Sequence, residues 1–178
     1  GGIYMKTYDH YLLAKEIAGT FKNLGGKLKR LVFIAGCIAP DINPFTYIKG
    51  HMFKDRHQFL DSFFKSGKAS PYNLGVMIHY IGDSFTFPHN SDFKGTLNEH
   101  LEYENRLHSF INSDFKRFAG KIKIPEKLSI SELFRTLHDE YTKGAKTLEN
   151  DCRYIYTACI EVVGRLLNQS EKISVATQ

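Results

Sequence analysis

The sequence predicts an all-α protein, a single-domain bundle of about seven helices. Apolar residues recur three and four positions apart through most of the chain, which is the spacing of one helix face. Ser/Thr-x-x-Glu patterns, typical of helix starts, occur at Thr96 and Ser129. No segment shows the sustained alternation of apolar and polar residues that predicts a strand. We find no internal repeat and no linker.

The first two helices are predicted around residues 9–24 and 27–38. The first has Thr7 or Asp9 as its N-cap and ends at Gly25-Gly26. The second (LVFIAGCIA) is apolar on most sides, so we expect it to be central. Pro40 should end this helix and leave Asp41 on its exit turn. Residues 41–54 contain Pro and Gly without a clean period, which indicates a loop.

Two further helices are predicted before the middle of the chain. One covers about residues 55–65, and the next begins at Ser70-Pro71, an N-cap followed by proline at the first helical position. This second helix has a core stripe of Leu74, Met77, Ile78, Ile81 and Phe85. His79 and Asp83 lie beside that stripe, so we expect both side chains to be buried.

The remaining helices begin at the two Ser/Thr-x-x-Glu patterns and near Asp151. Thr96 opens a helix that carries His100 and Glu104, and Ser129 opens one that continues to about Leu148. The last helix is predicted over residues 151–168. We therefore assign residues 1–168 to one domain and expect residues 169–178 to form a disordered tail.

Composition and charge place the chain among ordinary globular proteins. Its formal net charge is +5 and its pI is near 9.0, which favours an anionic partner such as a phosphate ester. Cys37, Cys152 and Cys159 are not spaced as a disulfide framework and are expected to be buried thiols. No apolar run is long enough to span a membrane, and no apolar signal core precedes KTYDH. We therefore expect a cytoplasmic location and no stable membrane insertion.

The stretch from His79 to Glu104 contains two possible metal chelates. His79 and Asp83 are four residues apart, as are His100 and Glu104, and residues at this spacing share a helix face with Cβ atoms about 6 Å apart. His89 lies between the two pairs. Imidazole and carboxylate donors suit zinc. A buried His79–Asp83 salt bridge or a purely structural zinc are the alternatives, but the repeated pair and the lack of cysteine donors favour an open, multinuclear metal site.

The order and spacing of these residues resemble the zinc-dependent phospholipase C family, whose superfamily includes single-strand-specific zinc nucleases. The similarity covers roughly residues 7–110 and includes DHYLLAKEI, APDIN, YIKGH and LGVMIHYIGD…PHN. The resemblance implies an all-α fold that holds a trinuclear zinc cluster. It also implies hydrolysis of phosphodiesters, in which zinc-activated water attacks phosphorus in line.

The resemblance also implies a ligand set. Asp83 would bridge two metals, one of which also takes His79 and a loop histidine, while the other takes His10. The loop histidine would be His51, with His57 as the alternative. His89, His100 and Glu104 would hold a third metal, and Asp41 would be a ligand or the catalytic base for water. The family's secreted members begin with a Trp that binds one metal, and this chain has no Trp. We therefore expect two to three zinc ions, with the His10 site the weakest.

The substrate class stays open at this level. A phospholipid or another phosphodiester is the first expectation. Single-stranded nucleic acid is the second, which would make the protein a nuclease. The third possibility is a metal-binding domain without turnover. The single-strand nucleases are generally longer and disulfide-linked, and the sequence supports neither feature.

Overall fold

The computed structural model describes residues 6–43, 52–66, 70–112, 114–120 and 122–176, with side chains described up to residue 169. These residues form seven α-helices and three short 3-10 helices, with no strand among them, so the all-α prediction is confirmed. The α-helices are α1 (Thr7–Thr20), α2 (Lys27–Ile42), α4 (Phe53–Ser66), α5 (Pro71–Ser84), α6 (Leu97–Ile111), α7 (Ile130–Lys143) and α8 (Leu148–Ala176). No described helix is both long and apolar enough to cross a lipid bilayer.

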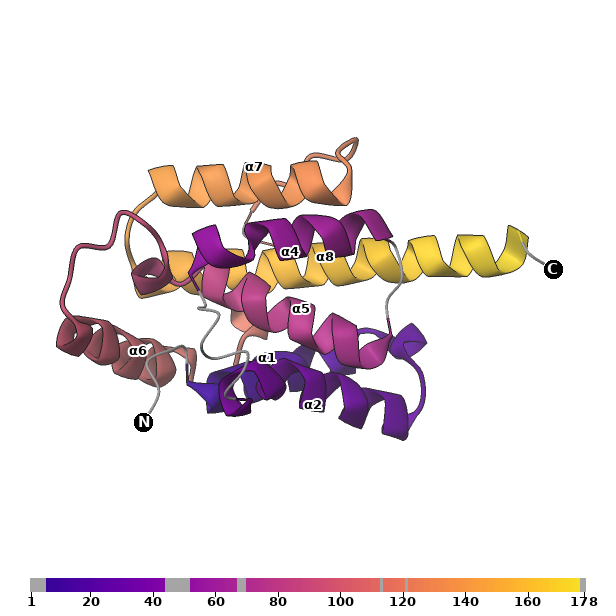
Figure 1. The fold of residues 1–178 in the computed structure, drawn as a ribbon, viewed down its shortest axis with the longest axis horizontal. Coiled ribbons are helices and arrows are strands. Elements are labelled where there is room, and N and C mark those ends of the chain that lie inside the picture. Colours follow the sequence, from indigo (N-terminus) through magenta and orange to yellow (C-terminus); the bar gives the residue numbers. More distant parts are fainter. Residues whose placement is uncertain (1–5, 44–51, 67–69, 113, 121, 177–178) are drawn as a thin grey trace.

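Helix α5 lies at the centre of the bundle. It packs against α1 and α2 on one side and against α4 and α8 on the other, as Figure 1 shows. Its predicted core stripe is buried, and so are His79 and Asp83, each with no exposed surface. Its start is also as predicted, since the Ser70 hydroxyl accepts a hydrogen bond from Asn73 N–H at 3.3 Å. The central position of α5 explains why Met77 and every later residue of the helix are removed from water.

Helices α2 and α5 approach each other through two glycines. A Cβ atom on Gly75 would lie 2.0 Å from the carbonyl oxygen of Phe33, and one on Gly36 would lie 2.1 Å from that of Tyr72. Only glycine permits such an approach of two helix backbones. The close contact brings the end of α2 beside the second half of α5.

Helix α2 differs from its prediction in two respects. It continues through Pro40 to Ile42, so Asp41 lies in its last helical turn and not on an exit turn. Proline is tolerated there because it removes a single hydrogen bond near the helix end. The helix is also not central, because Leu28, Leu31 and Val32 on its outer side are exposed.

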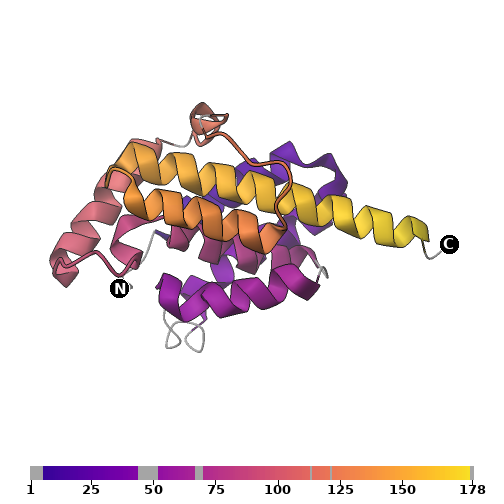
Figure 2. The ribbon, with the colours of Figure 1, turned by 90° about the horizontal axis from the view of Figure 1, so that it is seen from above.

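The helix starts at Thr96 and Ser129 are confirmed as capping boxes, in which both reciprocal hydrogen bonds are present. The predicted ends are less accurate. Helix α7 ends at Lys143, and α8 starts at Leu148. Helix α8 also continues to Ala176, whereas we expected it to end near residue 168 and to be followed by a disordered tail. Its last turns extend beyond the other helices in two perpendicular views (Figures 1 and 2).

Candidate metal centre

The centre is built around Asp83 on α5. Its Oδ2 lies 3.3 Å from Nε2 of His79, one turn earlier on the same helix. Its Oδ1 lies 3.3 Å from Nε2 of His10 and 3.3 Å from Nδ1 of His89. All four side chains are at most 1% exposed. One carboxylate thus contacts histidines from α1, from α5 and from the 3-10 helix Phe87–His89.

The first group of possible ligands comprises His10, Asp41 and His79. One donor atom from each lies within 4.8 Å of the others. The His10 and His79 rings stack with centroids 3.8 Å apart, and His79 Nε2 lies 3.7 Å from Asp41 Oδ1. The other ring nitrogen of His79, Nδ1, donates to the Cys37 carbonyl at 2.8 Å. This bond leaves Nε2 as the available donor to a metal, as is usual for ligating histidines.

The second group comprises His89, His100 and Glu104, whose donor atoms also lie within 4.8 Å of one another. Glu104 Oε1 is 3.3 Å from His89 Nε2 and 3.0 Å from His100 Nε2. Glu104 is buried, whereas the His100 side chain is 12% exposed. The imidazole of His89 faces Asp83 with one nitrogen and Glu104 with the other. It therefore connects the two groups through Asp83.

Seven of the eight predicted ligands lie in the described part of the chain, and all seven meet at this centre. The eighth, His51, lies outside the described residues. Its alternative, His57, belongs to neither group: its Nδ1 faces the Lys54 carbonyl at 3.0 Å, and its ring stacks on Phe53. His57 instead lines a small cavity of about 230 Å³ with Phe134 and His138.

The donor set fits a divalent metal such as zinc. Both ring nitrogens of His10 and both carboxylate oxygens of Asp41 are buried and have no hydrogen-bond partner among the described residues. A buried carboxylate without such a partner is costly, and a cation removes that cost. Histidine and carboxylate donors without cysteine are typical of zinc sites that keep a position open for water or substrate. Two candidate metal groups are thus present.

The neighbouring carboxylates change how readily the histidines bind protons. Burial lowers the pKa of His89, but Asp83 and Glu104 outweigh burial and raise it to about 9. Burial likewise lowers the pKa of His10, which Asp83 and Asp41 then raise above its ordinary value. For His79, burial and the adjacent His10 lower the pKa. Metal binding at this centre must therefore displace protons, and its affinity rises with pH.

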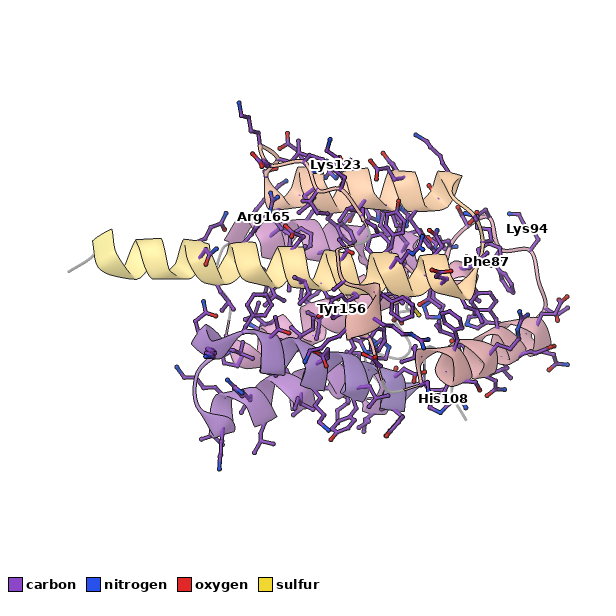
Figure 3. All side chains as sticks on the ribbon, turned by 180° about the vertical axis from the view of Figure 1, so that it is seen from behind. Phe87, Lys94, His108, Lys123, Tyr156 and Arg165 are labelled. Atoms are coloured by element: carbon purple, nitrogen blue, oxygen red, sulfur yellow. The ribbon has the colours of Figure 1, made fainter. Side chains whose placement is uncertain are left out.

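Several buried residues that support the centre were not found by sequence reasoning. Asp151, at the start of α8, accepts hydrogen bonds from Phe87 N–H at 3.1 Å, Tyr103 Oη at 2.8 Å and Tyr141 Oη at 2.8 Å. Phe87 opens the 3-10 helix that contains His89, and Tyr103 precedes Glu104. Figure 3 shows Phe87 beside the N-terminal end of α8. Burial raises the pKa of Asp151 to about 7, although these three donors oppose the shift.

A second support is Asn90, which follows His89 directly. Its amide nitrogen donates to the Ser84 and Thr86 carbonyls at 3.2 and 3.0 Å. Its Oδ1 accepts from His138 Nε2 at 2.8 Å. These bonds hold the segment between Asp83 and His89 against α7. The PHN motif placed Asn90 next to a predicted ligand, whereas nothing in the sequence indicated His138.

On the side of α1 that meets α6, buried Asp9 accepts a hydrogen bond from His108 Nδ1 at 2.7 Å. This bond joins the α1 turn that carries His10 to α6. His108 is labelled in Figure 3, on α6.

Comparison with known proteins agrees with this geometry. The family model described as zinc dependent phospholipase C matches residues 9–157, which is most of the chain and includes both candidate metal groups. No curated protein and no solved structure matches the chain significantly. With a match of this extent, the chain belongs to the zinc-dependent phospholipase C family.

Proposed function

We propose that the protein is a zinc-dependent phosphodiester hydrolase that cleaves phospholipids at the phosphate–glycerol bond. Family membership supports a metal-dependent, phospholipase C-like function in general. The observation that carries the specific proposal is the position of Asp83. A carboxylate in contact with His10, His79 and His89 would be shared by two metal ions, which together would supply the charge stabilisation that phosphoester hydrolysis needs.

In this proposal Asp83 and the first group hold two metals between them, and the second group holds one. Asp41, His79 and Asp83 would hold the first zinc together with His51, and His89, His100 and Glu104 would hold the second. His10 and Asp83 would hold a third zinc. Bound zinc acidifies a coordinated water and neutralises charge that develops on the phosphoryl oxygens.

The chain's own residues supply orientation and proton transfer. The Cys37 carbonyl fixes the His79 ring, so that its Nε2 faces the centre. Asp41 has two carboxylate oxygens without hydrogen-bond partners among the described residues, and its side chain is 7% exposed. A carboxylate whose oxygens have no hydrogen-bond partner can accept a proton from a water molecule bound beside it. Asp41 thus takes the proton as the water oxygen bonds to phosphorus and the bond to the glycerol oxygen breaks.

The edge of the centre indicates where the substrate enters. Among the seven described candidate ligands, Asp41 and His100 are the two with side chains more than 3% exposed. A phosphodiester would therefore approach between the end of α2 and the start of α6. The leaving glycerol oxygen would take its proton from solvent at that edge.

Parallel hydrolysis assays test this proposal. The zinc-loaded protein is incubated with a short-chain phosphatidylcholine and, separately, with single-stranded DNA. We expect release of phosphocholine, loss of activity with a chelator and no cleavage of DNA. His100→Ala should abolish turnover, whereas His57→Ala, a control at a histidine outside both groups, should retain it. Cleavage of DNA alone would identify a nuclease. No turnover on either substrate at full zinc occupancy would identify a non-catalytic metal-binding domain.

A further inference from the structure

The outer side of α2 is an exposed apolar surface. Leu28 is 75% exposed, Leu31 is 63% exposed and Ile42 is 66% exposed, and Val32 and Ala35 are also exposed. We call these five residues the outer α2 face. They follow one another at helical spacing from the first turn of the helix to its last. The opposite side of the same helix, with Phe33, Gly36 and Cys37, packs on α5.

A helix that is apolar on both sides indicates a partner on its exposed side. Scattered exposed leucines are ordinary, but a continuous row of them on a soluble surface is not. Helix α2 lies along the edge of the bundle (Figure 1), so no described helix covers this row.

The exposed charge in the chain segment that contains the outer α2 face has one sign. Between residues 6 and 43, every charged residue classed as exposed is a lysine: Lys6, Lys15, Lys22, Lys27 and Lys29. None of the three acids of this segment is exposed, because Asp9 is buried and Glu16 and Asp41 are half-buried. Glu16 also pairs with Lys116, and Asp41 belongs to the metal centre. Lys27 and Lys29 flank Leu28 along the helix. Exposed leucines bordered by lysines are typical of helices that lie on anionic lipid.

One end of the outer α2 face lies beside the metal centre. Ile42 directly follows Asp41, so the row ends beside a candidate ligand of the metal centre. On α6, Leu97 is 52% exposed one turn before His100, the other exposed ligand. Exposed apolar residues therefore lie within one turn of the two least buried of the described candidate ligands. A lipid surface that contacts α2 would therefore lie close to the proposed substrate entry between the end of α2 and the start of α6.

We propose that the outer α2 face docks the protein on an anionic lipid surface. The choice of lipid rests on the proposed function, in which a phospholipid is the substrate. Lipid headgroups are favoured over a second copy of the chain, because anionic headgroups pair with the lysines that border Leu28, whereas the end of α2 at Ile42 has no exposed acid to pair with them. Docking of this kind is peripheral, with Leu28 and Leu31 entering the lipid and the lysines lying among its headgroups.

Vesicle co-sedimentation tests the proposal. The zinc-loaded protein is mixed with vesicles of equal parts phosphatidylcholine and phosphatidylserine, or of phosphatidylcholine alone. We expect binding to the anionic vesicles that weakens with added salt. Leu28→Gln/Leu31→Gln should weaken this binding roughly tenfold or more, because two leucines no longer leave water. Phe59→Gln is the control, since Phe59 is 40% exposed on α4 and away from this face.

The lysines are tested separately from the leucines. Lys27→Gln/Lys29→Gln should weaken binding to the anionic vesicles by roughly tenfold and reduce its salt dependence. The same pair of substitutions should leave any binding to phosphatidylcholine alone unchanged. Equal binding of wild type and the leucine variant, or no binding by wild type, would overturn the proposal. So would a leucine variant that instead converts a wild-type dimer to a monomer in analytical ultracentrifugation.

Hydrolysis of a monomeric short-chain phosphatidylcholine separates docking from catalysis. The leucine variant should hydrolyse this soluble substrate at the wild-type rate and hydrolyse vesicles more slowly. Slower hydrolysis of the soluble substrate as well would contradict a role limited to docking. If wild type binds vesicles through Leu28 and Leu31 but hydrolyses neither substrate, the proposed function fails while the docking surface stands.

Discussion

The hydroxyl of Tyr103 donates a hydrogen bond to Asp151 Oδ2 at 2.8 Å, which ties α6 to the first turn of α8 one residue before Glu104. The same oxygen accepts from Phe87 N–H, two residues before His89. A single carboxylate thus positions two members of the second metal group without contacting a metal. Removing a hydrogen-bond partner of this kind often lowers metal affinity tenfold to a hundredfold.

We expect Tyr103→Phe to lower zinc affinity at the second group by roughly tenfold, because α6 loses its hydrogen bond to Asp151. Tyr141→Phe is the matched control, since it removes a hydroxyl donor to Asp151 from α7, which carries no ligand. Competition with a chromophoric chelator measures both affinities. Equal losses in the two variants would show that Asp151 contributes general stability and not ligand position.

The contact between α2 and α5 gives a second prediction. Gly75→Ala places a Cβ 2.0 Å from the Phe33 carbonyl and 2.7 Å from Cys37 N, so the helices must separate. We expect a loss of about 3 kcal/mol in the free energy of unfolding, measured in urea on the metal-free protein. Gly19→Ala is the control, because a Cβ there meets no atom within 4 Å. The free energy of unfolding of Gly19→Ala should be unchanged or higher by up to about 1 kcal/mol. A Gly75→Ala protein as stable as wild type would contradict the tight packing.

Local chemistry made much of the fold predictable. Ser70, Thr96 and Ser129 set helix starts through bonds to residues three positions later, which depend on nearby sequence alone. The pair His79 and Asp83 could be placed inside because both lie beside an apolar stripe. Helix ends were less predictable, since α2 passes Pro40 and α8 continues to Ala176.

Long-range support could not be predicted in the same way. Asp151 lies 48 residues from Tyr103 and 64 from Phe87, and no pattern in the sequence joins them. The exposure of Leu28 and Leu31 was also missed, because an apolar helix can equally be central or lie against an absent partner. Both cases depend on how distant helices pack, which local sequence does not determine.

His138 gives a prediction for pH dependence. Burial lowers its pKa from the ordinary 6.5 to about 4, and its neutral ring donates to Asn90 Oδ1. A pKa lowered by folding gives stability that is fully present above 6.5 and is lost as the pH falls toward 4. His138→Gln keeps a donor to Asn90 but does not titrate. In the metal-free state, the advantage of wild type over this variant in unfolding free energy should shrink across that interval. Because both proteins keep the same ligand histidines, their difference isolates His138, and a constant difference would contradict the assignment.

The bridging role of Asp83 predicts an unequal loss of metal. Asp83→Ala should lose more than one zinc per chain, because its carboxylate contacts histidines in both groups. His100→Ala should lose one zinc, since His100 contacts Glu104 in the second group alone. Elemental analysis after dialysis gives the stoichiometry, with roughly two to three zinc ions expected for wild type. His57→Ala should match wild type and serves as the histidine control. Equal losses for Asp83→Ala and His100→Ala would mean that Asp83 serves one metal, and a folded wild type that takes up no zinc would remove the basis for a catalytic centre.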